Sequence, residues 1–246
     1  MLDLYLGLTL VLAVSAAMFA VVVRFPQTSS RRQGLLLMVA VMAAMGLYTV
    51  FLRDSALLVR ALPFSNLIVL ANWFPIFAAL LAALVWRHTS GGWLRRGWPI
   101  AALVLTGLFA AVQPLLGLPP KCANQWNADQ ICRQTTPFTC TPACAATMLA
   151  SHGIPATEQE MAELCLTRRG TTWQGLYRGL KIKTAGTPYT VQVFTCTADA
   201  LRQLVPGWLI LSVGIPRSGE VDPIYQQQYS WTPGTIHSVL LFDFAP

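Results

Sequence analysis

Four long apolar segments in the first half of the chain limit its possible folds more than any other feature. They run over 4–23, 34–52, 67–86 and 98–118, and none carries a charged residue. Each has about 20 residues, enough for a helix that crosses the roughly 30 Å hydrocarbon core of a bilayer. We therefore predict a membrane domain of four transmembrane helices over 1–118, with the lipid bilayer as its partner.

The first segment is interpreted as a retained helix. No basic residue precedes it, and its apolar run is longer than the core of a typical signal peptide. Pro75 and Pro114 lie within or near the segments, where neighbouring helices can satisfy the backbone groups that proline frees. Because the interiors of the segments lack charge, they indicate an anchor and give no sign of a transport pathway.

Residues 119–246 have the pattern of an ordinary folded domain. Helices are predicted over 140–153, 157–165, 171–181 and 197–205, and strands over 189–195, 208–214 and 236–244. Pro142 near the first helix start, Gly153 at its end, and Thr157 and Thr172 as N-caps support these limits. The pattern predicts an α+β domain with one core, in which the long loop 215–235 forms a wall or lid beside His237.

The net charge of +7 does not indicate a nucleic-acid partner. Between residues 118 and 246, nine Lys and Arg face eight Asp and Glu, so this domain is nearly neutral. The excess positive charge lies in the loops between the apolar segments, where basic residues indicate which side of the membrane a loop occupies. Arg24, Arg31 and Arg32 follow the first segment, Arg53 and Arg60 the second, and Arg87, Arg95 and Arg96 the third. The positive-inside rule then places 119–246 outside the cytoplasm, with the chain in a bacterial inner membrane.

The cysteines favour the same location. All six follow Pro120, and Cys122 and Cys132 flank a short polar stretch. In an oxidising compartment these two are expected to form a disulfide, with a pair of free thiols as the alternative. No two cysteines have the spacing of a zinc knuckle, and His152 and His237 lack ligand-like neighbours. We expect no metal or other cofactor.

The stretch 134–144, QTTPFTCTPAC, carries the elements of a thiol active site. Cys140 opens a predicted helix, where unpaired backbone N–H groups and the helix dipole favour a thiolate. A cysteine nucleophile also needs a base and an oxyanion donor, for which His237 and Gln134 are candidates. Taken singly, a cysteine in an Ala-rich helix or a histidine on a strand is more often structural.

The order of these motifs resembles that of cysteine peptidase family 39, which includes the peptidase domains of bacteriocin-processing transporters that cleave double-glycine leaders. The resemblance lies in QTTPFTCTPACAATMLASHG, EMAELC, GTTWQGLYRGL and HSVLLF, and covers about 130–246. It implies a papain-like domain with Cys140 as nucleophile, His237 as general base and acid, and the Gln134 amide with the Cys140 N–H as oxyanion hole. It also implies that Cys144 is a packing residue and that 171–173 shapes the cleft.

Two departures from the family pattern bear on activity. Thr141 replaces the glycine that follows the nucleophile, which adds a side chain beside the oxyanion pocket. The family's acid that orients the histidine has no clear counterpart, because Asp243, six residues after His237, would lie about 20 Å away along a strand. Three alternatives stay open: a Cys–His dyad, an orienting residue elsewhere such as Asp222, or a C-terminally shortened chain.

The leading hypothesis is a membrane-anchored cysteine peptidase that hydrolyses a peptide or amide bond of an exported or membrane-associated polypeptide. An acyltransferase or transpeptidase would use the same thioester, and an inactive peptidase-like domain would only bind. With the opposite topology, the domain would process leader peptides in the cytoplasm. No GxxxxGK[ST] motif occurs, so any transporter would be a separate subunit.

Overall fold

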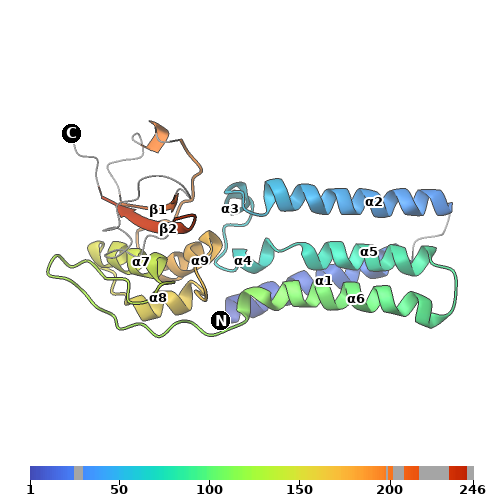
Figure 1. Cartoon of the computed structure of the whole chain (residues 1–246), viewed down its shortest axis with the longest axis horizontal. Helices are drawn as coiled ribbons and strands as arrows, with labels where there is room; N and C mark the ends of the chain where they lie inside the picture. The colour runs from blue at the N-terminus through green and yellow to red at the C-terminus, as the bar shows by residue number, and fades with distance from the viewer. Residues whose placement is uncertain (25–29, 198, 202–207, 216–232, 243–246) are drawn as a thin grey trace. The chain divides into compact units, whose positions relative to one another are not determined.

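The computed structural model describes residues 1–24, 30–197, 199–201, 208–215 and 233–242. The chain divides into two compact units, Met1–Leu116 and Gly117–Pro246 (Figure 1). The division falls beside the expected boundary between residues 118 and 119.

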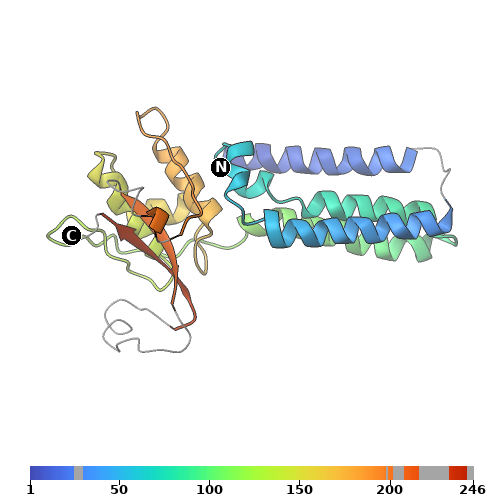
Figure 2. The ribbon, with the colours of Figure 1, turned by 90° about the horizontal axis from the view of Figure 1, so that it is seen from above.

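The first unit is helical. Its elements are α1 (Leu2–Arg24), α2 (Arg31–Leu47), the π-helical turn η1 (Tyr48–Leu52), α3 (Leu57–Ala61), α4 (Leu67–Leu70), α5 (Phe74–His88), α6 (Trp93–Val112) and the 3₁₀ turn η2 (Gln113–Leu115). Four helical stretches are long and apolar enough to cross a membrane: Leu2–Arg24, Arg32–Leu52, Leu67–His88 and Trp93–Leu115. These correspond to the four predicted segments, and Figures 1 and 2 show the long helices side by side.

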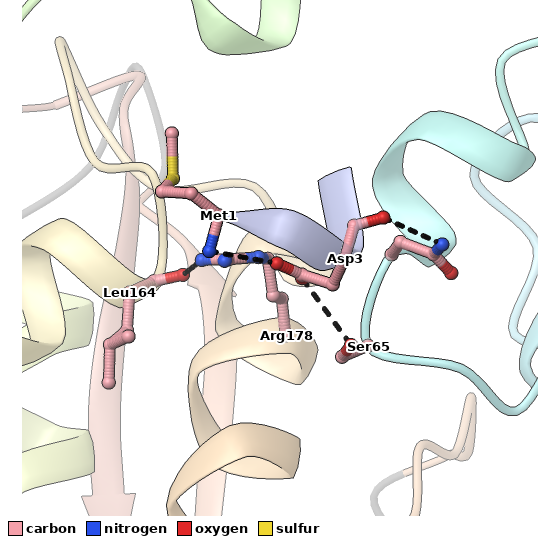
Figure 3. Close-up of polar contacts among 6 residues, drawn as sticks. Met1, Asp3, Ser65, Leu164 and Arg178 are labelled. Atoms are coloured by element: carbon pink, nitrogen blue, oxygen red, sulfur yellow. Dashed lines mark hydrogen bonds and ion pairs between the residues drawn. The ribbon is translucent and has the colours of Figure 1, made fainter. Parts of the chain in front are cut away.

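Helix α5 is the centre of this bundle and packs against α1, α2 and α6. Three of its five buried residues are alanines, and a Cβ added to Gly107 of α6 would lie 3.0 Å from the Cβ of Ala78. In a membrane, burial of apolar surface contributes little to the association of helices. Small residues stabilise the packing there because they let helix backbones approach closely. At the N-terminus, the Asp3 carboxylate accepts a hydrogen bond from the Ser65 hydroxyl (3.4 Å; Figure 3). The Asp3 backbone carbonyl accepts one from the Asn66 amide at 2.9 Å.

The third span is interrupted between α4 and α5. Pro75 lies in the first turn of α5, where its missing N–H removes no intrahelical bond. Neighbouring helices satisfy polar groups at the break: the Tyr48 hydroxyl donates to the Ala71 carbonyl, and the Asn72 amide donates to the Ala110 carbonyl at 2.6 Å. This is the compensation that an apolar environment requires for a broken helix.

The second unit is arranged around α7 (Cys140–Ser151), which packs against α8 (Glu158–Leu164), α9 (Trp173–Lys183), β1 (Leu209–Gly214) and β2 (Ile236–Leu241). Its core includes Ala145, Ala146, Leu149 and Met161. Arg178 of α9 is buried and donates to the carbonyl of Leu164 at the end of α8 (Figure 3). Helices α7, α8 and α9 form where the sequence predicts them.

The predicted helix limits follow local hydrogen bonds. The Thr157 and Thr172 side chains accept from the backbone N–H groups of Glu160 and Gly175, each at 3.1 Å. Gly153 has φ of 72°, a left-handed conformation that ends a helix at little cost for glycine. Capping signals of this kind are local, which explains why they can be recognised in a single sequence.

The sheet differs from the prediction. Strands β1 and β2 pair antiparallel with Val213 opposite His237, and they form the two-stranded sheet of the described residues (Figure 2). The strand predicted over 189–195 is wrong: this segment is irregular, and Tyr189 and Phe194 are 43% and 50% exposed. Alternation favours a strand only where a neighbouring strand pairs with it. Most of the predicted helix 197–205, most of loop 215–235 and the end of strand 236–244 lie outside the described residues.

The predicted disulfide between Cys122 and Cys132 is also wrong, because all six cysteines are free thiols in the structure. The Cys132 side chain packs in the core, while the Cys122 thiol lies 3.6 Å from the Pro120 carbonyl oxygen. Burial and the nearby Glu158 carboxylate raise the pKa of Cys122 to about 11, and the same two causes raise the pKa of Cys132 to about 12. A disulfide forms through the thiolate, which these surroundings disfavour. The cysteines therefore give no support to an oxidising compartment.

Candidate active site

Cys140 is the first residue of α7, as the sequence predicts. A tight turn before it fixes the start of the helix: the Thr139 N–H donates to the Thr136 carbonyl at 3.3 Å, and the two hydroxyl oxygens lie 3.0 Å apart. The Thr139 side chain is fully buried, which holds this turn in place. The sulfur of Cys140 is thereby placed at the helix N-terminus, where backbone N–H groups lack intrahelical acceptors.

The Cys140 thiol has an unusually low pKa. Burial raises it, whereas hydrogen bonds from the His237 side chain and the Ser238 backbone N–H, the charge of His237 and the Thr141 hydroxyl lower it. The result is a pKa of about 7 instead of 9.0. Low-pKa cysteines beside a histidine at a helix start are typical of nucleophilic thiols.

His237 reaches Cys140 because of the packing of β2 against α7. It is the second residue of β2, next to the strand's exposed first residue, Ile236. The structure therefore brings together two of the three predicted site residues, Cys140 and His237, from opposite ends of the domain sequence. A base within hydrogen-bond reach of the nucleophile is the geometry that thiol catalysis requires.

Cys144 lies one helical turn beyond Cys140 but has a different environment. Its thiol donates to the Ser238 carbonyl at 3.5 Å. Burial, followed by the neighbouring Cys140, raises the pKa of Cys144 to about 12. The two sulfurs of the stretch 134–144 are thus chemically distinct, with Cys144 in the packing position that the family resemblance implies.

Gln134, the third predicted site residue, is half-buried in the loop before α7. Its side-chain amide donates to the Thr136 carbonyl at 2.7 Å. An amide NH₂ group has two N–H donors, and this bond occupies one of them. The amide therefore has a second N–H that can donate to another acceptor.

Glu158 supports this loop and is not identified by the sequence motifs. Its carboxylate is fully buried and accepts from the Thr135 backbone N–H at 2.8 Å and from the Thr135 hydroxyl at 2.6 Å. Thr135 in turn accepts from the Ala123 N–H at 2.9 Å and directly follows Gln134 in the chain. A buried carboxylate with these donors fixes the loop that carries the candidate oxyanion donor.

Thr141, the departure from the family pattern, is turned into the domain. Its side chain is 5% exposed, and its hydroxyl oxygen lies 2.7 Å from that of Ser238. Sequence motifs do not indicate this pairing, because it joins residues 97 positions apart. Asp222 and Asp243, the candidates for an orienting acid, lie outside the described residues. Thr172 caps α9, in agreement with a structural role for 171–173.

In the part of the chain that the structure describes, no group of three or more His, Cys, Asp or Glu side chains is placed to hold a metal ion. The chain matches no protein-family model, and the comparisons with curated proteins and with solved structures likewise found no match. The likeness to peptidase family 39 therefore depends on the motifs quoted above.

Proposed function

We propose that the chain is a membrane-anchored cysteine peptidase with a papain-like catalytic domain over 119–246. The observation that carries the proposal is the contact between Cys140 and His237 at the start of α7, with the Cys140 pKa at about 7. A thiol at this pKa is about half ionised at neutral pH and needs no further activation. The four apolar helices would hold the domain beside the bilayer.

In this mechanism, the Cys140 thiolate attacks a peptide or amide carbonyl to form a carbon–sulfur bond. The carbonyl oxygen becomes an oxyanion, to which the Gln134 amide and the Cys140 backbone N–H donate. Collapse breaks the carbon–nitrogen bond, and His237 gives its proton to the leaving amine. Water then attacks the thioester as His237 takes its proton, which releases the acid and restores the thiolate.

The same thioester can pass its acyl group to an amine, so an acyltransferase remains the second candidate. The nucleophile is common to both reactions, and access of water or amine decides between them. The low pKa of Cys140 weighs against a domain that only binds, because binding alone does not require an activated thiol.

Trapping of the thioester tests the proposal. We expect the full-length protein in nanodiscs, mixed with a p-nitrophenyl ester of an N-acylated amino acid, to release a burst of about one nitrophenol per chain and to carry the acyl group on Cys140. Cys140→Ala should give no burst, whereas Cys196→Ala, which removes an exposed thiol elsewhere, should leave it unchanged. Adding glycine amide distinguishes transfer from hydrolysis. Equal acylation of Cys140→Ala would refute the mechanism.

We further propose that 119–246 lies on the outer side of a bacterial inner membrane and acts on exported or membrane-associated polypeptides. The support is the larger number of arginines in the first and third loops. Cys196 is exposed and can report the location. A membrane-impermeant maleimide should label it in spheroplasts before lysis. Labelling only after lysis would place the domain in the cytoplasm, where a separate transporter subunit becomes the expected partner.

A further inference from the structure

We propose that Ser238, through the Thr141 hydroxyl, is a positioning residue that fixes the helix carrying Cys140 against the strand carrying His237. This inference depends on the proposed role of Cys140 and His237. It assigns a use to the threonine that replaces the family's glycine. The two hydroxyl-bearing residues each directly follow one of the two candidate catalytic residues.

Three contacts from α7 converge on Ser238. The Thr141 hydroxyl oxygen lies 2.7 Å from the Ser238 hydroxyl oxygen, and the Cys144 thiol donates to the Ser238 carbonyl at 3.5 Å. The Ser238 backbone N–H donates to the Cys140 sulfur. The side chain, carbonyl and N–H of one residue thus each contact the first turns of α7.

Strand geometry explains how Ser238 can make all three contacts. In an antiparallel pair, the N–H and C=O of one residue point to the same edge of the strand, and alternate residues direct them away from the partner strand. Ser238 lies opposite Ser212 of β1. Since α7 uses both of its backbone groups, Ser238 occupies a position whose N–H and C=O point away from β1. His237, one residue earlier, has its backbone groups directed toward β1.

The hydroxyl pair of Thr141 and Ser238 also limits movement of α7 along β2. Thr141 is 5% exposed, and its hydroxyl oxygen also lies 4.0 Å from the Cys140 sulfur. A hydrogen bond between the buried Thr141 hydroxyl and the partly buried Ser238 hydroxyl fixes both side-chain rotamers and resists sliding of the helix along the strand. Because the distance between sulfur and imidazole depends on this register, the pair should affect the ionisation of Cys140 in addition to the direct contact of the Thr141 hydroxyl with the sulfur.

Ser238→Ala is the decisive variant, because it removes the partner of Thr141 while keeping the contact between Thr141 and Cys140 and the backbone N–H of residue 238. The readout is the rate of Cys140 alkylation by iodoacetamide as a function of pH, measured on the full-length protein in nanodiscs. We expect the midpoint to rise from about 7 by about 0.5 to 1 pH unit, and the thiolate fraction at pH 7, and with it the rate, to fall about two- to fivefold.

Matched variants distinguish positioning from loss of stability. Thr141→Val also removes the hydroxyl beside the Cys140 sulfur, so it should raise the midpoint at least as much as Ser238→Ala. The double variant should add little to Thr141→Val, and Thr141→Ser should restore the wild-type midpoint. Thr147→Val removes another buried hydroxyl from the same helix, one that accepts from the Cys132 N–H at 2.9 Å. It should lower the melting temperature without moving the alkylation midpoint.

An unchanged midpoint in Ser238→Ala, or the same shift in Thr147→Val, would overturn the positioning role. Alkylation requires no substrate, so this result is independent of whether the enzyme has been given a peptide that it cleaves. If the thioester trap fails while the alkylation profiles behave as described, the proposed reaction is wrong and the hydroxyl pair still positions the thiol.

Discussion

At pH 7, iodoacetamide is expected to modify Cys140 at least two orders of magnitude faster than Cys144. With pKa values of about 7 and about 12, about half of Cys140 but only roughly one part in 10⁵ of Cys144 is thiolate. The thiolate with the higher pKa is the better nucleophile, so the intrinsic reactivity of the Cys144 thiolate exceeds that of the Cys140 thiolate by a factor of about 100 to 300. The remaining preference is about 150- to 500-fold, and burial of Cys144 increases it.

The rate at Cys140 should rise with pH through a midpoint near 7, because the thiolate increases as the proton is lost. In denatured protein the same cysteine should titrate near 9.0, its ordinary value. Tandem mass spectrometry locates the label, since no tryptic site separates Cys140 from Cys144. Equal labelling of the two cysteines in folded protein, or a Cys140 midpoint near 9, would contradict the proposed activation by His237.

Local signals in the sequence identify much of the framework. The apolar segments predict the membrane helices because length and hydrophobicity alone determine whether a helix can cross a bilayer. Cys140 as the first residue of α7, and the caps Thr157 and Thr172, depend on residues within one helical turn. Such features need no knowledge of the rest of the fold.

The contacts that complete the site could not be predicted in this way. Ser238 and Thr141 meet only after β2 packs on α7, and Glu158 becomes fully buried only when the loop at Thr135 folds over it. The incorrect strand over 189–195 has the same origin, because its alternation says nothing about whether a partner strand is near. The incorrect disulfide of Cys122 was inferred from compartment and spacing, neither of which reports the direction of a side chain.

The low pKa of Cys140 has local causes and does not come from the net charge of the domain. In a domain with nearly equal numbers of acidic and basic residues, a general positive field cannot explain the stabilised thiolate. The causes are local: His237, the Ser238 N–H and Thr141 offset the burial of the sulfur. The contact with His237 is the strongest of these causes. Its removal should therefore let burial raise the pKa of Cys140.

His237→Ala is expected to lower turnover of a cleaved peptide by about three to four orders of magnitude. Two functions are lost together. Without the imidazole, burial raises the pKa of Cys140 from about 7 toward its ordinary 9.0, and no acid remains to protonate the leaving amine. Because both residues serve one pathway, Cys140→Ala combined with His237→Ala should be no worse than Cys140→Ala alone.

The two functions of His237 separate at high pH. Near pH 10, the Cys140 thiolate of His237→Ala forms without the histidine, so alkylation should recover to within a few-fold of the wild-type rate. Turnover should not recover, because proton transfer to the amine is still missing. His237→Gln, which retains a hydrogen-bond donor but no titrating ring, should show a smaller rise in the alkylation midpoint and the same loss of turnover. If turnover instead returned together with alkylation, His237 would serve only to ionise Cys140, and another group would have to supply the proton to the leaving amine.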